Sequence, residues 1–138
     1  MLSYKKGDTT MTKGQLAKEY FSSGLNCAQA VAMAFKDDVN LTEAQLKKVS
    51  IAFGGGFGRT RSVCGTVSGM TIAIGLLASN GDDKLAVYPI EQRAIELFKE
   101  RFGTIICADL LDKRIPCADI CEIAADITNQ ILIELGKI

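Results

Sequence analysis

Apolar residues recur at steps of three and four along most of this chain, and this spacing constrains its fold more than any other feature. It is the period of one face of an α-helix, whereas the alternation typical of a half-buried β-strand is scarce. The pattern predicts an all-α protein, a small helical bundle of about five to seven helices. The clearest stretch lies near the C-terminus, at Ile120, Ile123, Ala124, Ile127, Ile131 and Leu135.

Capping residues, glycines and prolines indicate where the predicted helices begin and end. Asn26 suits the N-cap of one helix, and Thr42 with Gln45 forms a capping box for the next. Pro89 is expected to interrupt or restart the helix around it, because proline has no backbone N–H to donate. The expected helices cover residues 12–22, 26–35, 42–53, 64–78, 82–102 and 117–135, with a short helical turn after Cys107.

A run of glycines at residues 54–58 predicts a loop between two helices, because glycine at this density destabilises a helix. A dinucleotide site would need a strand before the glycines and a helix opening inside the motif, and this context is missing. Bare backbone could also let the loop approach a cofactor, or Cys64, closely. The candidates for cofactor contact are Gly54, Gly55, Gly56 and Gly65.

Size and charge narrow the class of protein further. A chain of 138 residues suits one domain, spanning residues 1–138, and a hydrophobic content of 48% excludes a disordered protein. Lys+Arg and Asp+Glu each total 16. Without a basic excess to neutralise phosphates, nucleic-acid binding is not expected.

No segment predicts an export signal or a membrane anchor. The first eight residues lack the apolar core of a signal peptide, and the longest apolar stretch, residues 70–78, is too short to cross a bilayer. We therefore expect a cytoplasmic protein with no membrane insertion. That compartment keeps thiols reduced, so the five cysteines are better explained as reactive, metal-binding or buried than as structural disulfides.

The chain contains no histidine, which excludes histidine general bases, Cys-His pairs and His-ligated zinc. It also lacks the C-x-x-C-H pattern of haem attachment, and no C-x-x-C occurs at all. No haem is expected. Any chemistry therefore falls to the cysteine thiols.

Four cysteines, Cys27, Cys64, Cys107 and Cys117, lie at or near the start of a predicted helix. Free N–H groups and the positive end of the helix dipole favour a thiolate there. If the bundle brings these helix ends together, the four should meet in one site with at least one Cα pair within about 7 Å. Each could instead be a small core hydrophobe, which we favour for Cys121 on the apolar stripe of the last helix.

A metal is the alternative use of these cysteines. Their long spacings do not match a zinc finger, so a zinc or iron–sulfur site would have to be assembled by the fold from Cys27, Cys64, Cys107 and Cys117. Cys117 and Cys121 share a helix face with Cβ atoms about 5–6 Å apart, too far for an unstrained disulfide. A metal shared by that pair stays open.

Several short motifs, in order and spacing, resemble those of the C_GCAxxG_C_C family of redox-active proteins, and the resemblance covers nearly the whole chain. The resemblance implies a redox role for the four cysteines at helix starts, but no substrate. Two departures are Thr66, where the family has alanine, and the additional Cys121. The matching stretches are residues 24–31, 53–58 and 64–69, then Phe102-Gly103 with Cys107, and Cys117 with residues 124–127.

The leading hypothesis is a thiol-disulfide oxidoreductase in which two cysteines form a reversible disulfide. Cys64 is the expected attacking thiol, because it follows the glycine run and opens a helix. Arg59 and Arg61 could lower its pKa, or could be solvated loop residues. The alternatives are the four-cysteine metal protein and an interaction domain with core cysteines. The sequence identifies no redox partner protein and leaves open a homo-oligomer.

Overall fold

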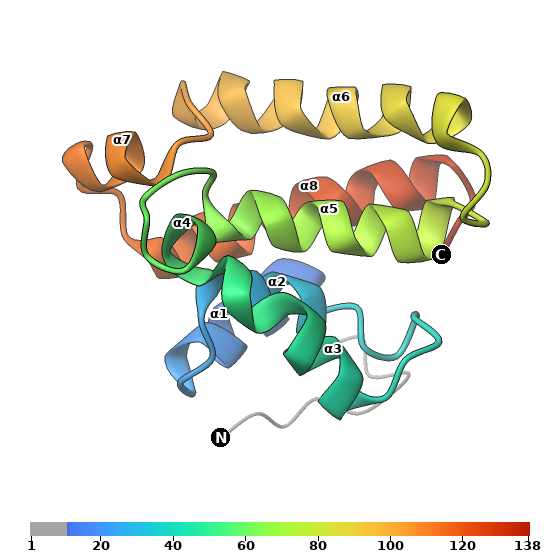
Figure 1. The fold of residues 1–138 in the computed structure, drawn as a ribbon, viewed down its shortest axis with the longest axis horizontal. Helices are drawn as coiled ribbons and strands as arrows, with labels where there is room; N and C mark the ends of the chain where they lie inside the picture. Colours follow the sequence, from blue (N-terminus) through green and yellow to red (C-terminus); the bar gives the residue numbers. More distant parts are fainter. Residues whose placement is uncertain (1–10) are drawn as a thin grey trace.

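The computed structural model describes residues 11–138, and this part of the chain is a small all-α fold, as predicted (Figure 1). It has seven regular helices and one distorted turn, α4. Within the described residues, β-structure is confined to an isolated antiparallel bridge between Val63 and Ile106. The elements are α1 (Lys13–Ser22), α2 (Cys27–Met33), α3 (Glu43–Ser50), η1 (Ile51–Phe53), α4 (Gly54–Phe57), α5 (Gly65–Ala78), α6 (Lys84–Phe102), α7 (Cys107–Asp112) and α8 (Cys117–Glu134).

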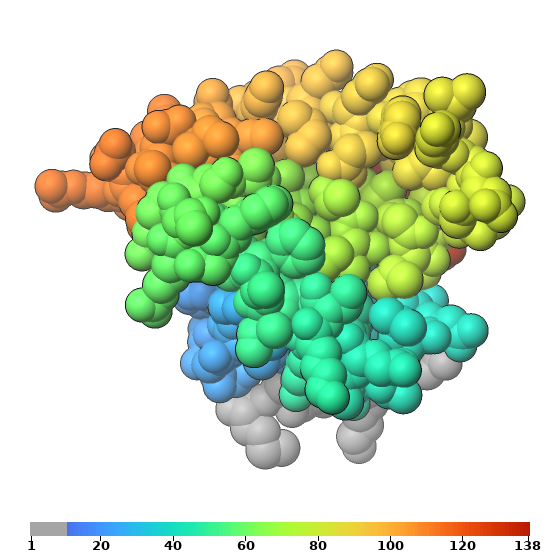
Figure 2. All heavy atoms as spheres, viewed as in Figure 1, coloured from blue at the N-terminus to red at the C-terminus, as the bar shows by residue number. Residues whose placement is uncertain are grey.

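The helices are arranged so that several of their starts lie at one end of the molecule. α5 and α8 cross the middle, α6 lies on one side of them, and α1, α2 and α3 lie on the other (Figure 1). α4 and α7 both sit at the end where α5 and α8 begin (Figure 1). Figure 2 shows the surface of the α4 segment, in green, against that of α7, in orange.

Membrane-spanning character is not found in the described part of the chain, where every helix is too short or too polar to cross a bilayer. The first eight residues, for which no signal-peptide core is expected, lie outside the described residues.

The core is built from the apolar stripes that the sequence predicts. Phe35 and Phe98 are fully buried among aliphatic side chains. On α8 the predicted stripe points inward through Ile120 and Ile131, which bury apolar surface against the other helices. Leu135 follows the end of α8 and is exposed, so it does not extend the stripe.

Capping boxes fix the starts of three helices. Asn26 and Thr42 are N-caps, as predicted, and the side chain of each accepts a hydrogen bond from the backbone N–H three residues on. Thr12 does the same for α1. The far ends are less regular: α2 stops at Met33 instead of continuing to Phe35, and α3 passes into the 3₁₀ turn η1.

Pro89 does not interrupt its helix, so that expectation is wrong: α6 is continuous through it. A proline at this position removes the hydrogen bond to the carbonyl of Leu85, four residues earlier. Both residues are exposed, so water can satisfy that carbonyl. The proline therefore costs one helical hydrogen bond without ending the helix.

The glycine run forms the tight turn α4 rather than an open loop. Gly55 and Gly56 have φ of 69° and 73°, a left-handed conformation that glycine adopts without a Cβ penalty. After the turn, two residues with side chains also have positive φ, Arg59 at 66° and Arg61 at 63°. The backbone from Gly55 to Arg61 is thus held in a compact, strained arrangement.

Two glycines of α5 allow the close approach of α2. A Cβ on Gly65 would lie 2.3 Å from Sγ of Cys27, and one on Gly69 would lie 2.8 Å from the carbonyl oxygen of Ala28. Gly65 and Gly69 are four residues apart and so lie on one face of the helix. This face has no space for side chains, which is why the two helices pack so closely.

We expect Gly69→Ala to destabilise the protein by about 1–3 kcal/mol, because the new methyl group meets the backbone of α2. Gly75→Ala is the matched control on the same helix, where a Cβ meets nothing within 4 Å. There the better helix propensity of alanine should stabilise by up to about 1 kcal/mol. Urea unfolding of both variants measures the difference. Equal effects would contradict the close-packed face.

Candidate functional site

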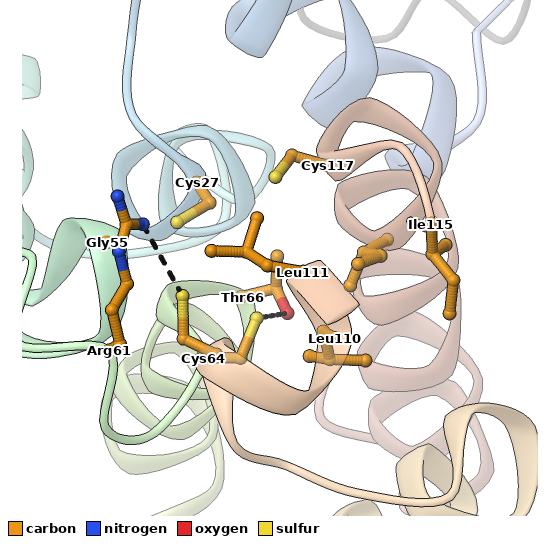
Figure 3. Close-up of a pocket in the computed structure, with 11 residues that line it drawn as sticks. Cys27, Gly55, Arg61, Cys64, Thr66, Leu110, Leu111, Ile115 and Cys117 are labelled. Atoms are coloured by element: carbon orange, nitrogen blue, oxygen red, sulfur yellow. Dashed lines mark hydrogen bonds between the residues drawn. The ribbon is translucent and has the colours of Figure 1, made fainter. Parts of the chain in front are cut away.

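Four cysteines from four helix starts line one cavity, which we call the cysteine cavity (Figure 3). Cys27, Cys107 and Cys117 are the first residues of α2, α7 and α8, and Cys64 is the N-cap of α5. The sequence-based expectation that these residues converge is therefore met. The remaining lining residues are Gly55, Arg61 and Thr66, with the aliphatic residues Leu110, Leu111, Ile115 and Ile120.

The four thiols differ in how far solvent reaches them. Cys64 is only 6% exposed, Cys27 and Cys107 are half-buried, and Cys117 is exposed. Figure 3 shows the sulfur of Cys117 directed into the cavity. The fifth cysteine, Cys121, is fully buried in the core and does not line the cavity, in accord with its interpretation as a core residue.

A short antiparallel pairing places Cys64 and Cys107 together. The N–H of Cys64 donates to the carbonyl of Ile105 at 2.7 Å, and the N–H of Cys107 donates to the carbonyl of Ser62 at 2.7 Å. Val63 and Ile106 form the bridge between these two bonds. Side chains alternate along a strand, so the two cysteines lie on the same face of the pairing.

The glycine turn brings the loop after it onto the start of α7. A Cβ on Gly56 would lie 2.7 Å from Cβ of Cys107, so only glycine fits there. Ala108 donates its N–H to the carbonyl of Arg61 at 3.3 Å. Arg61 in turn donates from Nη1 to Sγ of Cys107 at 3.7 Å. The arginine therefore approaches Cys107, not Cys64 as expected from its position in the sequence.

Cys27 lies beside Cys64 and acts electrostatically on three of the other four thiols. Its sulfur fills the space that a side chain on Gly65 would need, directly beside Cys64. Its charge, when it is ionised, raises the pKa of Cys64, Cys117 and Cys121 alike.

Burial raises the pKa of Cys64 from 9.0 to about 11, against the effect of its hydrogen bonds. Its thiol is hydrogen-bonded to Oγ1 of Thr66 at 3.1 Å, and backbone N–H groups of α5 also favour the thiolate. The desolvation of a nearly inaccessible sulfur outweighs both. The reason for choosing Cys64 as the attacking thiol is therefore removed, because burial makes its sulfur nearly inaccessible and raises its pKa.

Burial also raises the pKa of Cys117 and Cys121, reinforced by the neighbouring cysteines. For Cys117 the guanidinium of Arg61 acts in the opposite direction, with a smaller effect. A helix N-terminus therefore does not by itself make these thiols acidic. Accessibility, rather than an unusually low pKa, distinguishes Cys117 from Cys64.

The four predicted cofactor glycines make close contacts within the protein. Gly54 lies against the side chain of Asn26, Gly56 against Cys107, and Gly65 against Cys27. Gly55 lines the cysteine cavity. In the described residues, no three cysteine or acidic side chains are grouped closely enough to hold a metal ion.

Some residues that line the cavity carry a recognisable signal in the sequence, and others carry none. Thr66 departs from the family pattern two residues after Cys64, and its hydroxyl is hydrogen-bonded to the Cys64 thiol. Leu111 and Ile115 were not foreseen, because nothing in their local pattern shows that the segment around α7 folds over the cysteines. The cavity they complete has a volume of about 50 Å³, room for a few water molecules.

Comparison with known proteins assigns the chain to a family. The family model described as "Putative redox-active protein (C_GCAxxG_C_C)" matches residues 25–131. The chain therefore belongs to the C_GCAxxG_C_C family, a family of redox-active proteins, as the motifs predicted. Neither the curated proteins nor the solved structures gave a match.

The raised pKa of Cys64 predicts a loss of stability in alkali. The protonated thiol contributes fully to the free energy of unfolding below pH 9, and this contribution is lost as pH rises towards 11. The expected loss is roughly 2 kcal/mol by pH 11. Cys64→Ser, which keeps a partner for Thr66 but does not titrate, should remove this part of the pH dependence. Urea unfolding from pH 8 to 11 measures how the free energy of unfolding depends on pH. The same dependence in Cys64→Ser as in the wild type would refute the burial of this thiol.

Proposed function

We propose that this protein is a thiol–disulfide oxidoreductase whose reversible disulfide forms among the cysteines of the cavity. The observation that carries this is the convergence of Cys27, Cys64, Cys107 and Cys117, from four separate helices, on one small cavity. Cysteines that exchange a disulfide among themselves must have their sulfur atoms close together. Membership of a redox-active family agrees with this use of the site.

Cys117 is the thiol that a disulfide on a partner can reach. In the proposed reaction its thiolate attacks one sulfur of the partner disulfide, so that a Cys117–partner disulfide forms and the other partner sulfur leaves as a thiol. Cys27 then attacks Cys117, which releases the second partner thiol. Two electrons and two protons pass to the partner, and the protein is left with a Cys27–Cys117 disulfide.

Cys27 suits the resolving role because of where it lies. It faces the same cavity as Cys117, and a negative charge on its sulfur raises the pKa of Cys117. It is half-buried, so a large partner reaches Cys117 first. The buried Cys64 stays protonated at neutral pH, which leaves Cys27 as the neighbour of Cys117 best suited to attack it.

Two alanine variants test the assignment. Cys27→Ala and Cys121→Ala each remove one sulfur from a packed site and should each cost on the order of 1 kcal/mol of stability. With glutathione disulfide as oxidant, Cys121→Ala should form an intramolecular disulfide as the wild type does. Cys27→Ala should stop at the Cys117–glutathione mixed disulfide. Peptide mass mapping after alkylation measures this.

The outcomes of that experiment separate the candidate functions. If Cys27→Ala still closes an internal disulfide, the role of Cys27 is wrong. If neither the wild type nor any variant forms one, the redox proposal fails. Metal and sulfide analysis of anaerobically purified protein, with a free-thiol count, then decides between a metal protein and an interaction domain.

The pH dependence of the exchange provides a further test. Because the pKa of Cys117 is raised above its usual value, its thiolate fraction should increase roughly tenfold per pH unit from pH 6 to 8. The rate of the first step with glutathione disulfide should follow that increase. Stopped-flow or quenched alkylation kinetics report it, and a plateau below pH 8 would show an acidic thiol instead.

A further inference from the structure

Arg61 is held in a costly conformation that directs its guanidinium at one thiol. Its φ of 63° is unusual for a residue with a side chain. The N–H of Arg61 donates to the carbonyl of Gly55 at 3.2 Å, and its carbonyl accepts the N–H of Ala108 at 3.3 Å. These bonds hold the arginine between the glycine turn and α7. Its Nη1 contacts Sγ of Cys107, the contact drawn from Arg61 in Figure 3.

The surroundings of Cys107 favour a small substrate. The thiol is half-buried, beneath a cavity of about 50 Å³ with aliphatic walls. That volume admits a few waters or a molecule of that size, whereas pockets for organic ligands are typically about 300–1,000 Å³. A protein disulfide cannot enter such a space, but hydrogen peroxide can.

We propose that Cys107 and Arg61 form a reaction centre for small hydroperoxides, hydrogen peroxide above all. The inference rests on the proposed function, since it uses Cys27 as the resolving thiol. It adds a second oxidant that enters at Cys107, separate from the disulfide that reacts at Cys117. Arg61 supplies what the reaction needs beside the sulfur of Cys107: a cation with several N–H donors.

The reaction balances without any cofactor. The sulfur of Cys107 attacks one peroxide oxygen, the S–O bond forms as the O–O bond breaks, and the other oxygen leaves with the thiol proton as water. Arg61 donates to the oxygen on which negative charge develops. The sulfur of Cys27 then attacks the sulfenic acid, the S–O bond breaks, and a second water leaves. Two thiols and one hydrogen peroxide give one disulfide and two waters.

Trapping the sulfenic acid tests the proposal directly. In Cys27→Ala the resolving thiol is missing, so hydrogen peroxide followed by dimedone should label Cys107, read by peptide mass mapping. Adding Arg61→Asn should slow this labelling roughly tenfold or more, because a charge-assisted hydrogen bond is lost. Asparagine tolerates the left-handed backbone, so the turn is preserved. Cumene hydroperoxide, too bulky for the cavity, should react far more slowly than hydrogen peroxide.

Arg59→Asn is the matched control. Arg59 lies in the same loop with φ of 66° but does not line the cavity. It should change the labelling rate by no more than about twofold, because this exposed charge lies outside the cavity. An equal effect of both arginine variants would overturn the specific role of Arg61.

A glutathione disulfide arm keeps this inference separate from the proposed function. If glutathione disulfide yields the Cys27–Cys117 disulfide in the wild type while hydrogen peroxide leaves Cys107 unlabelled in Cys27→Ala, the hydroperoxide centre is refuted and the exchange function stands. Dimedone labelling of Cys117 instead of Cys107 would also refute the hydroperoxide centre. If neither oxidant reacts within the cavity, both proposals fail.

Discussion

The close approach of α2 to α5 is the constraint on which the site depends. Cys27 can lie beside Cys64 only because Gly65 has no side chain, and the two helices can stay that close only because Gly69 continues the same bare face. A single added methyl at either glycine would push apart the two helix starts that carry these cysteines. The glycines of this motif are thus explained by packing around sulfur, and the cysteine cavity is a consequence of that packing.

Burial, rather than the helix dipole, sets the character of the thiols. A helix start favours a thiolate, but the effect is modest and acts only near the terminus. Removing a sulfur from water acts in the opposite direction and is stronger at Cys64. The four cysteines therefore have different positions in one cavity: one buried, two half-buried and one exposed. This gradient supports a division of roles among them.

Local signals in the sequence predicted the fold well. Capping residues such as Asn26 and Thr42 act on their own helices, so their effect can be identified without knowing the tertiary structure. The convergence of the cysteines could also be inferred, because their shared place at helix starts is a local property. Features that depend on tertiary packing were not predicted from the sequence. These are the burial of Cys64, the contact of Arg61 with Cys107, and the aliphatic wall that the α7 segment adds to the cavity. The prediction for Pro89 was wrong for a related reason, since solvent exposure of the unpaired carbonyl decides whether a helix tolerates a proline.

We propose Cys27 as the shared partner of the cavity thiols, so it should take part in the disulfide that forms in the cavity. The wild-type protein is equilibrated across a series of glutathione redox buffers, and every cysteine is assigned as thiol or disulfide by differential alkylation and mass mapping. We expect Cys27 to be part of the internal disulfide that forms and Cys121 to stay a thiol throughout. An internal disulfide that leaves Cys27 free, or one that includes Cys121, would contradict it.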